Sequence, residues 1–226
     1  MAPRKDFEIA IVGGGIAGLT LAVALYHRGV KFTLYEQAAA FKEIGAGVSF
    51  TPNAVQAMGC CHEGISAAFN KVCTRNGWES KQKVWFDYLD GFNDPPQPGF
   101  TIVNSLGQRG VHRADFLDEL VKLLPDGIAR FNKHLTAISE DDNGKMVMSF
   151  LDGSKAEADA IIGCDGINSR VRQLVYPSSR ASYTHKYAYR GLIPMDKAIE
   201  AIGEEKAQNA CMHVSVIFTK GSSSCP

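Results

Sequence analysis

The sequence predicts an α/β fold, because a strand, a glycine-rich loop, a helix and a second strand follow one another over residues 8–36. Two further observations support this class. Residues 133–158 have the pattern of antiparallel strands joined by tight turns, and a second strand–loop–helix unit follows at residues 160–175. We therefore expect a Rossmann-like domain built on a parallel sheet, with a β-rich region inserted in it or appended to it.

The unit at residues 8–36 has the spacing of a dinucleotide-binding fingerprint, G-x-G-x-x-G, at Gly13, Gly15 and Gly18. Gly13 permits a tight turn out of the strand, Gly15 leaves room for a pyrophosphate, and Gly18 lets the helix pack closely on the sheet. Glu36 ends the second strand, where a carboxylate can accept hydrogen bonds from a ribose. The pattern predicts dinucleotide binding without separating FAD from NAD, and Glu36 argues against a 2′-phosphate. A glycine-rich turn in an ordinary α/β protein is the alternative.

The remaining elements follow from apolar periodicity and turn residues. Strands are expected at 84–89, 100–104, 133–140, 145–150, 155–158 and 160–164, in addition to 9–12 and 31–35. Helices are expected at 19–28, ended by Gly29, after Pro52, at 113–124 and at 170–175, with Ser169 as the N-cap of the last. Residues 90–99 hold three prolines and are expected to form a surface loop.

Composition excludes several functional classes. Lysine plus arginine and aspartate plus glutamate both number 24, so no basic field favours nucleic acid. We expect no membrane span, because no segment approaches 18 consecutive apolar residues. The N-terminus is short and polar and lacks a secretory apolar region, so a cytoplasmic location is expected.

The six cysteines show no C-x-x-C spacing. Cys60, Cys61 and His62 are consecutive, but adjacent cysteines point apart and no second ligand pair follows. We therefore expect free thiols and no metal site.

Three further segments could contact a ligand. Gly45, Ala46 and Gly47 form a small-residue loop where a backbone can approach a ligand, although a tight loop before a helix explains them equally well. Arg113 sits at a helix N-terminus, where a cation is unfavourable and suggests an anionic partner; an exposed arginine facing water is the alternative. Asp165 and Gly166 follow a buried strand as the fingerprint does, and the alternative is a capped turn with an Asp165–Arg172 surface pair.

Taken together, these motifs resemble those of the FAD-dependent aromatic hydroxylases, the group A flavoprotein monooxygenases, and in particular fungal salicylate-hydroxylase-like members. The resemblance runs from about residue 7 to about residue 213. It implies FAD as the cofactor, NADH or NADPH as the reductant, and O2 and a small aromatic acid or phenol as the other substrates.

The resemblance also implies roles for individual residues. The ADP half of FAD would bind at Gly13, Gly15 and Gly18, with Glu36 as the acid. The small-residue loop of the family matches Ala46 and Gly47, and Arg113 matches an arginine that reaches the flavin cofactor. The DG motif of the family matches Asp165 and Gly166 and is tied to FAD and to the nicotinamide cofactor. Arg190 matches an arginine proposed to act near the flavin, which makes it the candidate catalytic residue.

The sequence departs from the family in its last part. A G-D motif followed by a long helix is expected after Gly191 and is absent. We therefore predict a C-terminally truncated protein: residues 1–180 as an incomplete FAD-binding domain, 181–213 as the start of the substrate-domain sheet, and 214–226 as a non-native or intron-derived tail. Such a chain should expose apolar surface on the FAD-domain sheet and retain FAD weakly.

The predicted function is hydroxylation of a phenolic or aromatic acid by an FAD-dependent monooxygenase. Two alternatives remain open from the sequence: another Rossmann-type oxidoreductase, such as an NAD-dependent dehydrogenase or a flavin oxidase, and an inactive nucleotide-binding fragment. Substrate identity, the choice between NADH and NADPH, and the oligomeric state are not specified by the sequence.

Overall fold

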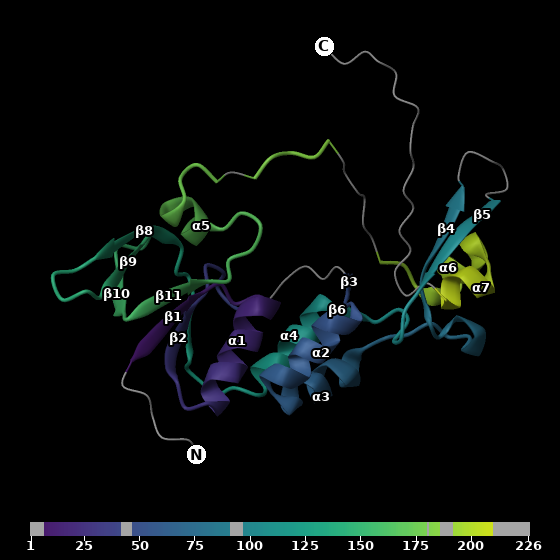
Figure 1. The fold of residues 1–226 in the computed structure, drawn as a ribbon, viewed down its shortest axis with the longest axis horizontal. Helices are drawn as coiled ribbons and strands as arrows, with labels where there is room; N and C mark the ends of the chain where they lie inside the picture. Colours follow the sequence, from purple (N-terminus) through teal and green to yellow (C-terminus); the bar gives the residue numbers. More distant parts are fainter. Residues whose placement is uncertain (1–6, 42–46, 91–96, 180, 186–191, 210–226) are drawn as a thin grey trace, which may run out of the picture. The chain divides into compact units, whose positions relative to one another are not determined.

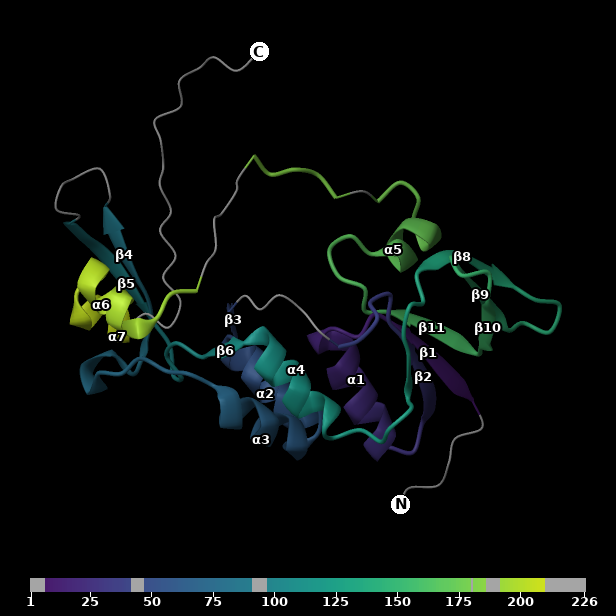
Figure 2. The same ribbon diagram turned by 180° about the vertical axis from the view of Figure 1, so that it is seen from behind.

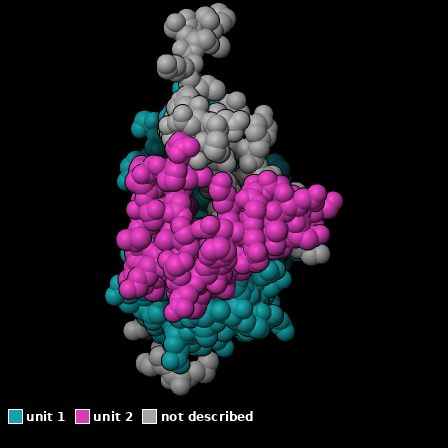
Figure 3. Space-filling view, turned by 90° about the vertical axis from the view of Figure 1, so that its right-hand side faces the viewer, with its two compact units in different colours: residues 1–46, 53–72, 111–191 teal, residues 47–52, 73–110, 192–226 magenta. Residues whose placement is uncertain are grey.

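The computed structural model describes residues 7–41, 47–90, 97–179, 181–185 and 192–209. The chain divides into two compact units, which Figure 3 distinguishes by colour. Unit 1 comprises residues 1–46, 53–72 and 111–191, and unit 2 comprises residues 47–52, 73–110 and 192–226. The predicted tail at 214–226 lies outside the described residues, and the predicted domain boundary at residue 180 stays a prediction.

Unit 1 is built on a four-stranded parallel sheet with the order β11-β1-β2-β7. Its strands are β1 (Glu8–Val12), β2 (Lys31–Tyr35), β7 (Ala129–Arg130) and β11 (Ala160–Gly163). The two strand–loop–helix units recognised in the sequence thus bring β1 and β11 side by side. The carboxyl ends of all four strands meet at one edge, which is where ligands bind in open α/β sheets.

Both faces of this sheet are covered, as Figure 1 shows. Helix α1 (Ile16–His27) lies on one face, and α5 (Arg170–Val175) and three antiparallel strands lie on the other: β8 (Leu135–Glu140), β9 (Met146–Phe150) and β10 (Lys155–Ala158). Ala10 and Val12 belong to the core cluster that includes Met148 and Phe150. Since successive side chains alternate, Ile9 and Ile11 face the helix side. The central strand is thus covered on both faces, since Ile11 is 0% exposed, whereas Ile161 and Ile162 of the edge strand β11 are only half-buried.

The other helices of unit 1 are grouped beside α1, and Figure 2 shows them from behind. They are α2 (Pro52–Cys61), α3 (Glu63–Val72) and α4 (Arg113–Val121). Phe69 of α3 and Phe116 of α4 are fully buried and meet edge to face, with ring centroids 5.6 Å apart. This contact fixes α4, whose N-terminal residue is Arg113.

Unit 2 contains a two-stranded hairpin of β4 (Val84–Asp90) and β5 (Gln97–Val103). Its other elements are β3 (Gly47–Ser49), a 3-10 turn at Glu79–Lys81, α6 (Met195–Ile202) and α7 (Glu204–Gln208). Strand β6 (Gly110–His112) pairs with β3, and the division between the units falls within β6. On the hairpin Tyr88 stacks on Phe100, which is 61% exposed, so this hairpin exposes apolar surface.

The predicted fold class is confirmed, and most predicted elements are found within a few residues of their expected bounds. Strand β5 begins at Gln97, inside the segment expected to be loop. Helix α4 ends at Val121 rather than Leu124. No helix among the described residues has the length and apolar character needed to cross a membrane.

A polar cluster joins the loop before β8 to the turn between β9 and β10. The Lys133 ammonium lies 2.6 Å from Oδ2 of Asp152 and 2.8 Å from Oγ of Ser154. The hydrogen bond from Lys133, together with those from Ser154, lowers the pKa of Asp152 from its ordinary value of 3.8 to about 2.

This shift predicts a pH-dependent difference between the wild type and Asp152→Asn. Because the folded-state pKa lies below the unfolded one, the carboxylate stabilises the fold above pH 3.8 and loses this effect as the pH falls toward 2. We expect the wild type to be the more stable protein in urea unfolding at pH 5 and the difference to shrink between pH 4 and pH 2. A difference that stays constant over this range would contradict the assignment.

Candidate functional site

The first loop of unit 1 is a corner that only glycine can form at two positions. Gly13 has φ +105°, and a Cβ there would lie 2.5 Å from the carbonyl oxygen of Cys164. A Cβ on Gly18 would lie 1.9 Å from the carbonyl oxygen of Gly13. Both predicted roles are therefore seen in the structure: Gly13 makes the turn beside the loop after β11, and Gly18 allows α1 to pack against that turn.

Among the residues that the structure describes, no side chain caps the N-terminus of α1, so its first N–H groups can donate to a ligand. Its N-cap is Gly15, which has no side chain to accept hydrogen bonds from the first turn, and that turn contains no acidic residue. The first N–H groups of a helix have no intrahelical partner and carry a partial positive charge. This corner is therefore suited to a phosphate group.

Arg113 lies next to this helix end. Its Nη2 is 3.1 Å from the position that a Cβ of Gly15 would occupy, so the space left free at Gly15 faces a guanidinium group. A guanidinium binds phosphate oxygens through paired N–H donors. The structure therefore brings together the glycine and the arginine that the sequence placed separately in a phosphate-binding role.

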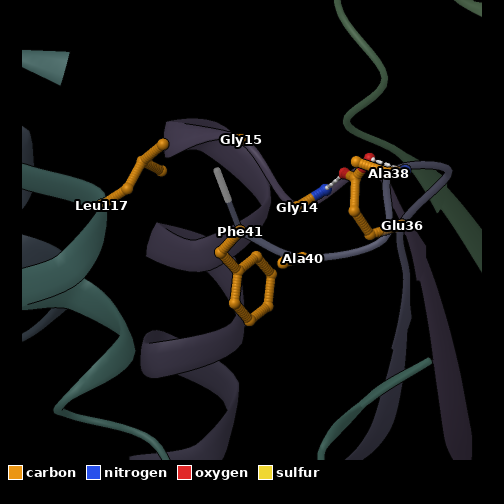
Figure 4. Close-up of a pocket in the computed structure, with 7 residues that line it drawn as sticks. All are labelled: Gly14, Gly15, Glu36, Ala38, Ala40, Phe41 and Leu117. Atoms are coloured by element: carbon orange, nitrogen blue, oxygen red, sulfur yellow. Dashed lines mark hydrogen bonds between the residues drawn. The ribbon is translucent and has the colours of Figure 1, made fainter. Parts of the chain in front are cut away.

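The Glu36 carboxylate spans the two loops at the end of β1 and β2. Its Oε2 accepts a hydrogen bond from the Gly14 N–H at 2.6 Å, and its Oε1 accepts one from the Ala38 N–H at 2.8 Å. Figure 4 shows both bonds. Each carboxylate oxygen can accept more than one hydrogen bond, so the group is oriented by the backbone and retains acceptor capacity for a ribose hydroxyl.

A hollow lies beside this corner in unit 1. It is lined by Gly14, Gly15, Glu36, Ala38, Ala40, Phe41 and Leu117. Phe41 lies directly against the corner, since a Cβ on Gly14 would be 2.7 Å from Cε1 of its ring. This contact, together with the Glu36 carboxylate, explains why the position between Gly13 and Gly15 is also glycine.

Asp165 follows β11 on the same edge of the sheet. Its Oδ2 accepts hydrogen bonds from the backbone N–H groups of Arg170 at 2.6 Å and Val171 at 3.0 Å. Asp165 therefore caps α5 through backbone N–H groups, as the alternative of a capped turn predicts, and the Arg172 side chain donates to the carbonyl oxygen of Ile167. The Oδ1 of Asp165 is buried and has no hydrogen-bond partner among the described residues, which leaves an unsatisfied acceptor at this point.

A second pocket opens beside Asp165. It has a volume of about 470 Å³ and is lined mainly by polar side chains: Gln37, His134, Leu135, Thr136, Leu151, Asp165, Asn168, Arg170 and Gln173. Close by, burial and the Asp165 charge raise the pKa of the Cys164 thiol, so this cysteine stays protonated at neutral pH. Gly166 has φ +76° and open space around it.

The predicted site residues thus fall into three groups. Gly13, Gly15, Gly18, Glu36, Arg113, Asp165 and Gly166 lie in unit 1, at or beside the carboxyl edge of its sheet. Gly47 opens β3 in unit 2, and its predicted role in cofactor binding stays a prediction. Ala46 and Arg190 lie outside the described residues. Their roles in binding or catalysis stay predictions.

Comparison with known proteins agrees with the nucleotide-binding geometry of the site. Residues 6–191 match a family model described as "FAD binding domain". An FAD-dependent monooxygenase of Monascus ruber is 47% identical over 93% of the chain and 50% of its own length. A salicylate hydroxylase of Sarocladium schorii is 41% identical over 94% of the chain and 47% of its own length. The chain thus spans about half the length of the curated relatives it matches.

A solved structure agrees. A salicylate hydroxylase in complex with its substrate superimposes with a TM-score of 0.61 and 31% identity, covering 78% of this chain and 40% of that one. The resemblance to fungal FAD-dependent monooxygenases inferred from the motifs is confirmed. The family model covers most of this chain, and the glycine corner has the geometry that the family's fingerprint requires. The chain therefore belongs to the FAD-binding domain family.

Proposed function

We propose that this chain supplies the cofactor-binding part of an FAD-dependent monooxygenase that hydroxylates a phenolic or aromatic acid. The observation that carries the proposal is the meeting of the glycine corner, Glu36, Arg113 and Asp165 within unit 1. The similarity to salicylate hydroxylases supports an aromatic acid as the substrate class.

The residues present fit FAD. The corner at Gly13–Gly18 leaves space that a Cβ would fill, and the uncapped helix end and Arg113 offer donors to a pyrophosphate. Glu36 would accept hydrogen bonds from the adenosine ribose, and the buried Oδ1 of Asp165 would accept one from a hydroxyl or amide of the cofactor. When bound, FAD supplies electron transfer from NADH or NADPH and the activation of O2.

The described residues of the site would bind and orient the cofactor and would not form bonds with the substrate. Backbone N–H groups fix the Glu36 carboxylate, and the α1 dipole together with Arg113 compensates the charge of the pyrophosphate. In the overall reaction one oxygen atom of O2 enters the aromatic ring and the other leaves as water, with NADH or NADPH as the two-electron donor. Arg190 stays our candidate for a residue that acts near the flavin.

The test is oxidation of NADH and NADPH by the FAD-loaded chain, with and without salicylate. We expect salicylate to accelerate oxidation and to yield a hydroxylated product, which is heavier by one oxygen atom if the carboxylate is retained and lighter by the mass of CO if the hydroxyl group replaces the carboxylate, which leaves as CO2. Dehydrogenase activity that needs no O2 would contradict the proposal. FAD binding without salicylate-dependent oxidation would limit this chain to the cofactor-binding part, and failure to bind FAD would contradict the proposal.

A further inference from the structure

We propose that Asn132 is a positioning residue for Glu36: its left-handed backbone conformation locks the loop after β2 in the form that orients the carboxylate. Two segments are involved, the loop of residues 36–41 after β2 and the β7–β8 loop of residues 131–134. The consequence for cofactor binding rests on the function proposed above, whereas the positioning itself does not.

Three backbone hydrogen bonds join the loop after β2 to the end of β7 and to the β7–β8 loop. The Glu36 N–H donates to the carbonyl oxygen of Arg130 at 2.9 Å. The Lys133 N–H donates to the carbonyl oxygen of Glu36 at 2.9 Å, and the Asn132 N–H donates to that of Ala38 at 3.0 Å. The Glu36 N–H is therefore held by the end of β7, and the Glu36 carbonyl oxygen by the β7–β8 loop.

This pattern requires an unusual conformation at Asn132. In an extended strand successive N–H groups point to opposite sides, so residues 132 and 133 could not both donate to the same neighbouring loop. Asn132 has φ +57°, and this left-handed residue turns the chain so that both N–H groups face the loop after β2. Among residues with a side chain, asparagine tolerates this region best.

Side chains secure the β7–β8 loop on both sides. Toward the corner, Phe131 meets Phe41 edge to face with ring centroids 4.8 Å apart, and Phe41 lies against Gly14. Away from it, the Lys133 ammonium binds Asp152 and Ser154 and lies 5.6 Å from the centroid of the Phe150 ring. The loop is thus a rigid support between the antiparallel strands and the site.

The contacts of the β7–β8 loop lead to the Gly14 and Ala38 N–H groups, which both donate to the Glu36 carboxylate. Ala38 both donates to Oε1 of Glu36 and accepts from Asn132, so a shift of the β7–β8 loop moves a donor of the carboxylate directly. Gly14 is reached through Phe131 and Phe41. Opening at Asn132 should therefore expose the Gly14 and Ala38 N–H groups to solvent exchange.

The experiment measures amide hydrogen exchange in the ligand-free chain for Asn132→Ala and Asn132→Gly. Alanine disfavours the left-handed region and glycine does not, so we expect exchange at Gly14 and Ala38 to rise about fivefold or more in Asn132→Ala and to return toward the wild-type rate in Asn132→Gly. The control is Gly144→Ala, which places alanine at φ +78° in the β8–β9 turn, where the nearest atom is 3.7 Å away, and which should strain the backbone at least as much as Asn132→Ala does.

The control separates positioning from lost stability. Faster exchange at Gly14 and Ala38 in Asn132→Ala but not in Gly144→Ala supports the inference. Unchanged exchange in Asn132→Ala, or an equal rise in both alanine variants, overturns it. The same proteins are then titrated with ADP: affinity should fall in Asn132→Ala alone. If the wild type binds no ADP, the proposed function fails, and the exchange rates still decide the role of Asn132.

Discussion

Glu36→Gln is expected to weaken ADP binding by about tenfold or more. The substitution removes the charge from a carboxylate that accepts the Gly14 and Ala38 N–H groups through separate oxygens, and it turns an NH2 group toward one of these donors. Hydrogen bonds to charged groups contribute about 1.5–3 kcal/mol, and about 1.4 kcal/mol corresponds to a tenfold change in affinity. Isothermal titration with ADP at fixed ionic strength measures the effect.

The control for this variant is Glu119→Gln. Glu119 lies on α4 in the same unit, and its carboxylate binds two lysines, Lys71 and Lys122, so the chemical change is matched. We expect ADP affinity to remain that of the wild type. We also expect the wild type to bind ADP more tightly than 2′-phosphorylated ADP and Glu36→Gln to narrow this preference. Equal ADP affinity of Glu36→Gln and wild type would exclude the carboxylate from the site.

Gly18→Ala is expected to destabilise the fold by about 4 kcal/mol or more, the range reserved for severe core or backbone conflicts. The new Cβ would lie 1.9 Å from the Gly13 carbonyl oxygen, and this atom belongs to the backbone of a turn that itself packs on Cys164. Neither partner can move away as a flexible side chain would, so α1 must separate from the turn. Chemical unfolding followed by circular dichroism measures the loss.

The matched control is Gly59→Ala, another substitution of a helical glycine. Its Cβ would meet only Oγ of Ser66 at an ordinary 3.4 Å, and alanine is favoured over glycine in a helix by about 1 kcal/mol. This variant should equal or exceed the wild type in stability. If Gly18→Ala unfolds within about 1 kcal/mol of the wild type, the close approach of α1 to the corner is not what the structure describes.

The sequence was sufficient for the parallel sheet and the corner because their signals are local. Strand β1 is apolar on both faces, as a strand buried on both sides must be, and the glycine spacing follows from contacts that a Cβ would block. Ser169 was assigned as an N-cap from its position, and its hydroxyl accepts a hydrogen bond from the Arg172 N–H at 2.9 Å.

Features that depend on contacts between segments far apart in the sequence could not be predicted, because no local pattern of residues indicates them. Asn132 is one polar residue between two strands, and nothing near it in sequence indicates a left-handed residue that donates to a loop almost a hundred positions earlier. Gly14 was a possible clue, since a third glycine at this position implies that something packs against it. The start of β5 was predicted too late, because Pro98 was assigned to a loop, whereas a proline can lie in an exposed edge strand.

The central claim is that the corner at Gly13–Gly18 and Glu36 binds the ADP half of FAD. Its most direct test is titration of the wild-type chain with FAD, followed by flavin fluorescence, with ADP and riboflavin as competitors. We expect saturable binding of one FAD per chain that ADP displaces and riboflavin does not. Displacement by riboflavin but not by ADP would contradict it.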